Sequence, residues 1–323
     1  MCLLHLRPPR RSASLDARNP SPITTDKLSA GSCYTPVTSQ TNLTDRIYFA
    51  VHLALTVLVC VRRPVVEHWP WYVVWNLTAM GAILALTRRQ RDGGLWEFAH
   101  NWQPVLFFFT VFEEVSFLSL ALRGAWQNSY LIAWESALFA VRPADWLHRY
   151  SSPWFSELLE IGYLSFYPLY PAVAGVLWLR RRRARYAGGF RRLTDGLSMG
   201  YAVCYATYLL FPTRSPFHNA ENSASLAAGQ GTGPFHLLVG RIQNSAGVHG
   251  NAFPSAHIML TFVVLVFVVR YFPRYAPWLL LCLLLMCVAA VYDGYHYGVD
   301  VIGGAVLGMA VGVVFVGREA TGD

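Results

Sequence analysis

Two short histidine motifs carry the side chains best suited to chemistry. Pro254-Ser255-Ala256-His257 leads into one long apolar run, and His296-Tyr297-Gly298-Val299-Asp300 opens another. Imidazoles exchange protons near neutral pH, so a pair of them can supply a nucleophile and a general acid or base. On a helix, Asp300 would share one face with His296 and could hydrogen bond to it. The motifs therefore predict that His257, His296 and Asp300 are catalytic.

Two further residues predict a phosphate site beside these histidines. Pro254 and Ser255 suit the first turn and the N-cap of a helix, and such an end offers free N–H groups and a positive dipole to an anion. Arg214, in Phe211-Pro212-Thr213-Arg214-Ser215-Pro216, would add a fixed cation. We therefore expect Ser255 and Arg214 to bind substrate phosphate.

Other interpretations of the histidines remain open. A lone histidine near a helix end is usually structural or solvated, and neither motif is specific by itself. By ligand type, two histidines and one aspartate would also suit zinc. A serine N-cap and a nearby arginine favour an anion over a metal cation, so we predict phosphoryl transfer without a metal and without a cofactor.

The composition predicts an integral membrane protein built of helices. Of the 323 residues, 54% are hydrophobic and only 14% are charged, against about a quarter charged in soluble proteins. The apolar runs are continuous and do not alternate with polar residues, as the strands of a barrel would. The net charge of +8 comes from arginines in short loops between these runs, which is typical of membrane orientation and disfavours nucleic acid as a partner.

Helix spacing places the two motifs on the same side of the membrane. A bilayer core of about 30 Å needs about 20 helical residues per span. Nineteen of the 26 basic residues fall on the side of the N-terminus, which predicts both termini in the cytoplasm. Between His257 and His296 the chain crosses twice, so both histidines should face outward. We predict eight spans, at residues 46–61, 69–87, 103–122, 156–179, 193–212, 256–272, 277–292 and 299–317.

These spans divide the chain into three parts. Residues 1–44 are polar and lack periodicity, which predicts a disordered tail. Residues 45–94 would form an N-terminal transmembrane hairpin, and residues 95–318 a membrane-embedded catalytic core. Two outer segments are long: 123–155 predicts an amphipathic helix on the bilayer surface, and 213–255 is a Gly, Asn and Ser-rich loop.

The motifs resemble signatures of the type 2 phosphatidic acid phosphatase superfamily, which are a basic segment, then Pro-Ser-x-His, then Ser-Arg followed by His and, four residues on, Asp. The resemblance covers about residues 95–316. Within the superfamily, His296-Tyr297-Gly298-Val299-Asp300 is similar to the His-Tyr-x-x-Asp of the inositol phosphorylceramide synthase branch. The resemblance implies a six-helix membrane core and chemistry without a metal.

The resemblance also implies a role for each predicted site residue. His296 would be the nucleophile that forms a phosphohistidine, and Asp300 would orient it. His257 would protonate the leaving oxygen and later activate the acceptor. Ser255 and Arg214 would hold phosphate oxygens.

The chain departs from the family pattern at two cations. Ala289-Ala290 stands where the Ser-Arg pair is expected, and of the first basic segment only Arg214 remains. A phosphomonoester carries nearly two negative charges near neutral pH, whereas a phosphodiester carries one and needs fewer cations. The losses favour a diester substrate and transfer between lipids.

We therefore predict a lipid phosphotransferase or phosphatase that acts at the outer face of a membrane, with a lipid, an alcohol or water as acceptor. Arginine stands almost everywhere in place of lysine, which hints at a GC-rich genome and hence a bacterial inner membrane. One alternative is a plain lipid-phosphate or isoprenyl-diphosphate phosphatase. Another is a non-enzymatic transporter or scaffold, for which mid-span Glu113 and Glu114 would be the best evidence.

Some polar residues near the motifs have weaker predictions. Asp293 is close enough in sequence to affect His296, but we expect a solvated loop acid. One of four outer-loop residues could touch a substrate headgroup; they are His218, His236, His249 and Arg241.

Overall fold

The computed structural model describes residues 41–218, 233–245 and 250–318, without the side chains of 105–110, 244 and 245. All regular elements in these ranges are helices. Most of the predicted tail, residues 1–40, lies outside the described part. Its last residues contradict the prediction of disorder, because Leu43 and Thr44 already belong to the first helix. Asn42 caps that helix by accepting a hydrogen bond from the Asp45 N–H at 2.7 Å.

Each predicted span corresponds to helix in the structure, and one span is divided. The predicted span 156–179 is two helices, α6 and α7, that meet at Ser165. The helices of the predicted spans are α1 (Leu43–Arg62), α2 (Trp69–Arg89), α3 (Gly94–Arg123), α6 (Pro153–Leu164), α7 (Phe166–Leu179), α8 (Gly189–Leu210), α11 (Ala256–Tyr271), α12 (Ala276–Tyr292) and α13 (Gly298–Gly317).

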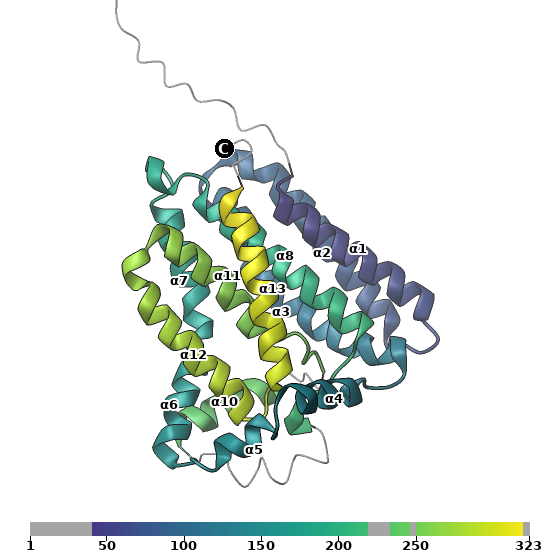
Figure 1. The fold of residues 1–323 in the computed structure, drawn as a ribbon. Helices are drawn as coiled ribbons and strands as arrows, with labels where there is room; N and C mark the ends of the chain where they lie inside the picture. The colour runs from purple at the N-terminus through teal and green to yellow at the C-terminus, as the bar shows by residue number, and fades with distance from the viewer. Residues whose placement is uncertain (1–40, 219–232, 246–249, 319–323) are drawn as a thin grey trace, which may run out of the picture. The chain divides into compact units, whose positions relative to one another are not determined.

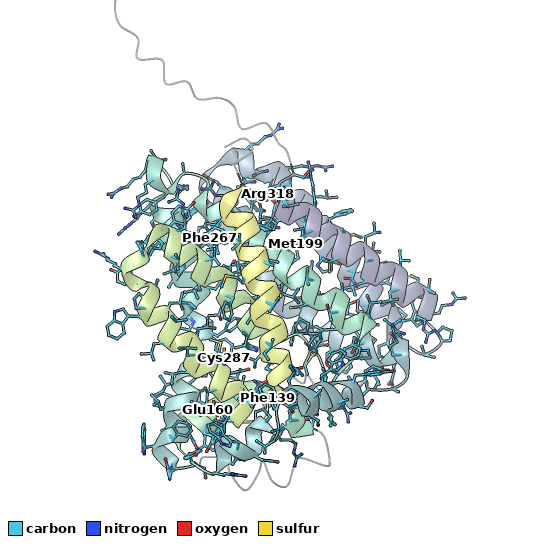
Figure 2. The ribbon with its side chains drawn as sticks, viewed as in Figure 1. Phe139, Glu160, Met199, Phe267, Cys287 and Arg318 are labelled. Atoms are coloured by element: carbon cyan, nitrogen blue, oxygen red, sulfur yellow. The ribbon has the colours of Figure 1, made fainter. Side chains whose placement is uncertain are left out.

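Length and hydropathy identify four candidate membrane spans among the described helices. They are Leu43–Arg62, Trp69–Asp92, Pro273–Tyr292 and Gly298–Gly317, while α11 is apolar but shorter. Large apolar side chains of these helices are exposed, for example those of Trp278, Leu284 and Val306. Figure 2 shows side chains projecting outward along the helices. Such surface is stable against lipid and not against water. The count of eight spans and the six-helix core stay predictions.

A row of glycines lets α13 approach α11 at backbone distance. A Cβ added at Gly304 would lie 2.6 Å from the Ser255 carbonyl oxygen, and one at Gly308 would meet the backbone of Met259. Small residues at four-residue intervals allow this close packing between membrane helices. The packing matters for the site, because the first turns of α11 and α13 flank the two histidine motifs.

Buried polar contacts join the N-terminal hairpin to α3. Asp45 of α1 accepts a hydrogen bond from Gln103 at 2.6 Å and lies 3.0 Å from the His100 ring. Asn76 of α2 donates to Glu114 at 2.7 Å. Glu114 is therefore buried in a helix contact, whereas Glu113 is exposed. This favours helix pairing over transport as the role of Glu114.

Short helices gather at the end of the bundle where α13 begins, as Figure 1 shows for α4, α5 and α10. The segment 123–155, predicted to form one amphipathic helix on the bilayer surface, contains two helices, α4 (Asn128–Leu138) and α5 (Pro143–His148). The segment predicted as a loop, 213–255, contains a helix that we did not predict, α10 (Pro234–Ser245). The described 3-10 turns are η1 (Gln90–Asp92), η2 (Ala184–Tyr186), η3 (Pro216–His218) and η4 (Pro273–Tyr275).

Candidate active site

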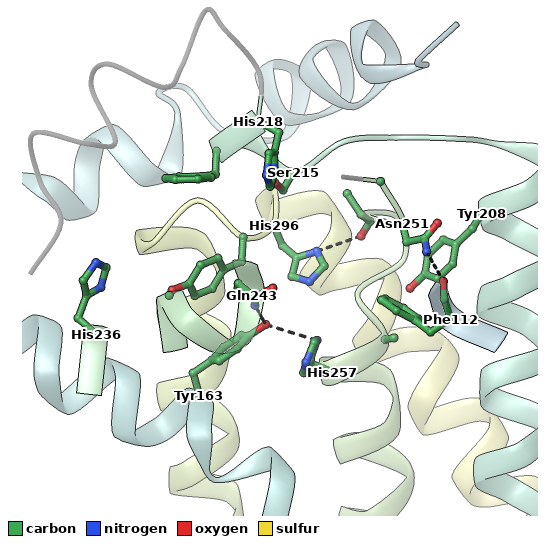
Figure 3. A pocket seen from close by; sticks show the side chains of 16 residues that line it. Phe112, Tyr163, Tyr208, Ser215, His218, His236, Gln243, Asn251, His257 and His296 are labelled. Atoms are coloured by element: carbon green, nitrogen blue, oxygen red, sulfur yellow. Dashed lines mark hydrogen bonds between the residues drawn. The ribbon is translucent and has the colours of Figure 1, made fainter. Parts of the chain in front are cut away.

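A cavity of about 250 Å³ opens at this end of the bundle, between α6, α10, α11 and the loop that precedes α13. Figure 3 shows both predicted catalytic histidines at the cavity, with the hydrogen bonds that orient them. The other lining residues come from α3, α8, the turn around η3 and residues 250–252. Among the described lining residues, histidines are the only side chains that can carry positive charge, and none is Arg or Lys.

The structure brings His257 and His296 together. Their ring centroids are 6.4 Å apart, with the ring planes inclined by 60°. A phosphorus atom between them would have one imidazole on each side, as an attacking group and a leaving-group acid require. His257 lies in the first turn of α11, and His296 lies in the turn between α12 and α13.

A backbone carbonyl, rather than Asp300, makes the hydrogen bond to His296. The ring Nδ1 lies 3.0 Å from the Ala252 carbonyl oxygen and 3.6 Å from Asp300 Oδ2. Our prediction of one shared helix face was wrong in detail, because His296 precedes α13 and only Asp300 is inside it. A carbonyl can only accept, so Nδ1 carries the proton and Nε2 keeps the lone pair that a nucleophile needs.

Asp300 is held behind the ring as a fully buried carboxylate. Its Oδ2 accepts a hydrogen bond from the Tyr297 N–H at 2.8 Å, while Oδ1 has no hydrogen-bond partner. The position suits electrostatic stabilisation of a positive imidazole, since the nearest separation between the two groups is 3.6 Å.

His257 lies against aromatic rings and a tyrosine hydroxyl. Its ring centroid is 4.5 Å from that of Phe166 and 5.0 Å from that of Tyr163. The Tyr163 hydroxyl is 3.4 Å from His257 Nδ1 and accepts a hydrogen bond from Gln243 at 3.0 Å. Because the Tyr163 oxygen already accepts from Gln243, the Tyr163 hydroxyl can donate its own proton to His257 Nδ1. Nδ1 is then an acceptor, so in a neutral His257 ring the proton is on Nε2.

Neither predicted phosphate ligand lines the cavity. Ser255 occupies the N-cap of α11, but its hydroxyl makes no capping bond and is buried without a partner. Pro254 precedes this N-cap, so the prediction that it begins the helix was wrong. Arg214 is held by Asn128 through its backbone at 2.9 Å, and its guanidinium lies 4.7 Å from the centroid of the Trp126 ring. The adjacent Ser215 does line the cavity.

Asp293 is not the solvated acid that we predicted. It is fully buried beside Glu160 of α6, and burial together with that neighbour raises the pKa of Asp293 well above its usual range. Of the other polar residues considered, His218 and His236 line the cavity, Arg241 is exposed on α10, and His249 lies outside the described part.

Three groups at the site were not predicted. Tyr163 and Gln243 support His257, and the Ala252 carbonyl supports His296. A tyrosine in an apolar run suggests an interfacial aromatic residue, and the position of a backbone carbonyl cannot be predicted from residue types. Only Gln243 had a signal, because the apolar spacing of Phe235, Leu238, Val239 and Ile242 predicts an amphipathic helix.

The profile of the PAP2 superfamily matches residues 129–314, which is more than half of the chain. The chain belongs to the PAP2 superfamily. The matched residues run from α4 to α13 and include all five predicted site residues. Membership of this superfamily and the apolar helices indicate an integral membrane protein with a phosphatase-type fold. No curated protein and no solved structure matches the chain.

Proposed function

We propose that this PAP2 superfamily protein transfers or hydrolyses the phosphate group of a membrane lipid through a phosphohistidine at His296. The observation that carries the proposal is the His257–His296 pair, 6.4 Å apart at one cavity, with the Asp300 carboxylate behind the second ring. The arrangement matches a nucleophile and an acid placed on opposite sides of one phosphorus atom.

In the first half of the reaction, His296 Nε2 attacks phosphorus, the N–P bond forms and the bond from phosphorus to the leaving oxygen breaks. His257 gives its Nε2 proton to that oxygen, and Asp300 stabilises the positive ring of the phosphohistidine. In the second half, His257 removes a proton from the hydroxyl of water, an alcohol or a lipid. The acceptor oxygen bonds to phosphorus as the N–P bond breaks, which restores both histidines.

The charge of the cavity favours a phosphodiester over a phosphomonoester. Ala289 and Ala290, at the positions of the missing Ser-Arg pair, are fully buried in α12, so no cation replaces that arginine there. Among the described lining residues only imidazoles can carry positive charge, so the site suits a substrate with one negative charge. Ser255 and Arg214 remain the proposed phosphate ligands, because each keeps a buried donor without a partner.

The finer assignment follows from this charge and from His296-Tyr297-Gly298-Val299-Asp300. We propose transfer of a diester headgroup between lipids, as in the inositolphosphotransferase-like branch, rather than plain phosphatase activity. The proposed place is the outer face of a bacterial inner membrane, on the arginine distribution described above.

The test is a lipid panel assayed with purified protein, following free phosphate and new phospholipid with and without an added alcohol acceptor. We expect diester lipids to be turned over faster than phosphatidic acid, and the acceptor to divert product from hydrolysis. Comparable turnover of both lipid classes would remove the basis for a diester substrate. Release of phosphate alone, whatever the acceptor, would make the protein a plain phosphatase.

The histidine variants test the mechanism itself. We expect His296→Ala and His257→Ala each to abolish turnover with normal membrane insertion. Phosphate can label His296 only in the proteins that keep this residue, which are wild type and His257→Ala. His68→Ala, in the exposed turn before α2, is the matched control and should keep wild-type activity. Activity within about twofold of wild type in either catalytic variant would contradict the mechanism. If no histidine takes up label from any lipid, the protein is a transporter or scaffold instead.

A further inference from the structure

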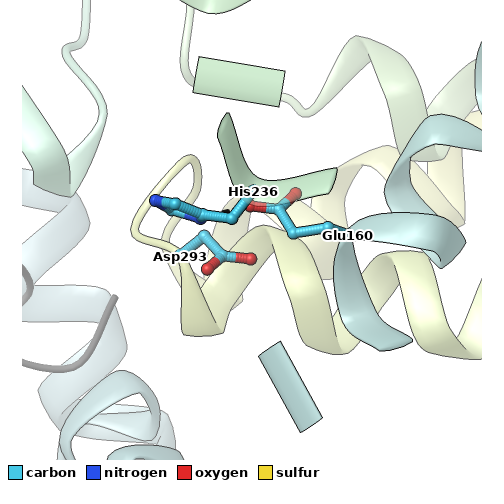
Figure 4. A group of neighbouring side chains, drawn as sticks. All are labelled: Glu160, His236 and Asp293. Atoms are coloured by element: carbon cyan, nitrogen blue, oxygen red, sulfur yellow. Dashed lines mark hydrogen bonds and ion pairs between the residues drawn. The ribbon is translucent and has the colours of Figure 1, made fainter. Parts of the chain in front are cut away.

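A second group of ionisable side chains lies next to the cavity, outside the catalytic pair. Glu160 of α6, His236 of α10 and Asp293 of the turn after α12 each point a ligand atom into one small volume, with these atoms all within 4.8 Å of one another. Figure 4 shows the Asp293 carboxylate beside the side chains of Glu160 and His236. Both carboxylates are fully buried, and the His236 side chain is 13% exposed.

The hydrogen bonds within this group leave most of the carboxylate oxygens unsatisfied. His236 Nδ1 and the Tyr295 hydroxyl both donate to Glu160 Oε1, at 2.7 and 3.1 Å. Glu160 Oε2 and both oxygens of Asp293 are buried and have no hydrogen-bond partner. A buried ionised carboxylate without a partner is strongly destabilising. A cation at the centre of two carboxylates and one imidazole would stabilise all three groups.

We infer that Glu160, His236 and Asp293 bind one divalent transition-metal ion of the Zn²⁺ or Mn²⁺ type. Asp293, whose two oxygens have no hydrogen-bond partner, offers one ligand atom within 4.8 Å of those of Glu160 and His236. Carboxylate oxygen and imidazole nitrogen bind zinc at about 2.0 to 2.2 Å, which puts tetrahedral ligand atoms about 3.4 Å apart. Ligand atoms that already lie within 4.8 Å of one another need only small rotations to reach that spacing.

Mixed nitrogen and oxygen ligands select the class of ion. Imidazole favours zinc and other transition metals, while Mg²⁺ prefers oxygen ligands and keeps its own waters. If Nδ1 of His236 is the ligand, its hydrogen bond to Glu160 breaks on binding and the neutral ring carries its proton on Nε2. The Tyr295 hydroxyl can keep its bond to Glu160 and hold that carboxylate in place.

The ion would have a structural role and would take no part in the reaction. It would tie α6 and α10 to the turn that starts at Asp293 and contains His296. Tyr295 and His236 line the cavity, so the same ion would fix one wall of it. The inference does not rest on the proposed phosphoryl transfer, and its test reads metal content and melting temperature rather than turnover.

The experiment uses the full chain, purified in detergent with a histidine-free affinity tag and without chelator. Elemental analysis should find about one transition-metal ion per chain. After the ion is removed with EDTA, ZnCl₂ or MnCl₂ should raise the melting temperature by about 5 °C once the site is saturated. MgCl₂ should give no comparable shift.

Two variants assign the ion to these residues. Asp293→Asn and Glu160→Gln should lose both the bound metal and the shift. Glu157→Gln is the matched control, one turn away, because Glu157 caps α10 through the Phe235 and His236 N–H groups and is not part of the group. It should bind metal as wild type does.

Three results would overturn the inference. They are a metal-free wild-type protein that millimolar Zn²⁺ and Mn²⁺ do not stabilise, undiminished binding in Asp293→Asn, and loss of binding in Glu157→Gln alone. If wild type proves metal-free and is not stabilised, the buried group is explained instead by Glu160 and Asp293 sharing one proton. It uses wild type only, so it decides the question even if a variant fails to fold.

Discussion

Replacement of Asp300 by asparagine separates two roles that a carboxylate behind a histidine can have. In many sites the carboxylate both fixes the tautomer of the ring and stabilises its positive charge. Here the Ala252 carbonyl, 3.0 Å from Nδ1, fixes the tautomer without Asp300. Asp300→Asn should therefore leave His296 in its nucleophilic form and remove only the charge.

The size of the effect follows from the separation of the two groups. At 3.6 Å and an effective dielectric constant of about 20, a carboxylate and a positive ring attract each other by about 5 kcal/mol. Each 1.36 kcal/mol is tenfold in rate, so full loss of this attraction would slow formation of the phosphohistidine by about three orders of magnitude. Residual polarity of the amide reduces this figure. We expect kcat to fall about 100-fold to 1,000-fold and KM to change less than about threefold.

The assay is steady-state turnover of the best lipid from the panel, with the folded fraction of each variant measured by thermal unfolding in detergent. Glu135→Gln is the matched control. Like Asp300, Glu135 is a buried carboxylate that accepts a backbone N–H at the start of α13, from Gly298 at 2.7 Å. Burial raises the pKa of Glu135, and its removal should affect stability more than kcat. A kcat for Asp300→Asn within about threefold of wild type would refute the electrostatic role, as would an equal loss in the control.

Three further variants test other parts of the site. Tyr163→Phe removes the hydroxyl 3.4 Å from His257. The loss of one neutral hydrogen bond should lower kcat about fivefold and leave KM unchanged. An unchanged kcat would exclude Tyr163 as a positioning residue. Gly308→Ala puts a Cβ against the Met259 backbone and should lower the melting temperature. Gly317→Ala, whose Cβ meets nothing within 4 Å, should not lower it. Equal melting temperatures would contradict close packing of α11 and α13. Arg214→Ala should lower kcat/KM for diester lipids about 10- to 100-fold, the range for a charge-assisted hydrogen bond, and no change would remove Arg214 from phosphate binding.

Hydropathy predicted the helices well because each apolar run depends on its own residues and on the width of a bilayer. Where the prediction failed, local chemistry had been given too little weight. Asn42 and Asp45 form a capping box that starts α1 inside the predicted tail. The Gly, Asn and Ser content of 213–255 concealed the amphipathic spacing of α10. The chain also breaks the run 156–179 at Ser165, although both halves are helical as predicted.

By itself the sequence determined which residues are helical and that the two histidine motifs lie at the same end of the bundle, because the number of crossings between them depends only on hydropathy. It also identified the residue types that phosphoryl transfer needs. Only the tertiary structure decided what each imidazole touches. Ala252 and His296 are 44 positions apart, and Tyr163 and His257 are 94 apart. The buried Glu160, His236 and Asp293 come from three different segments. Such contacts depend on how helices pack against one another, through distances of a few ångströms that no local pattern of residues records.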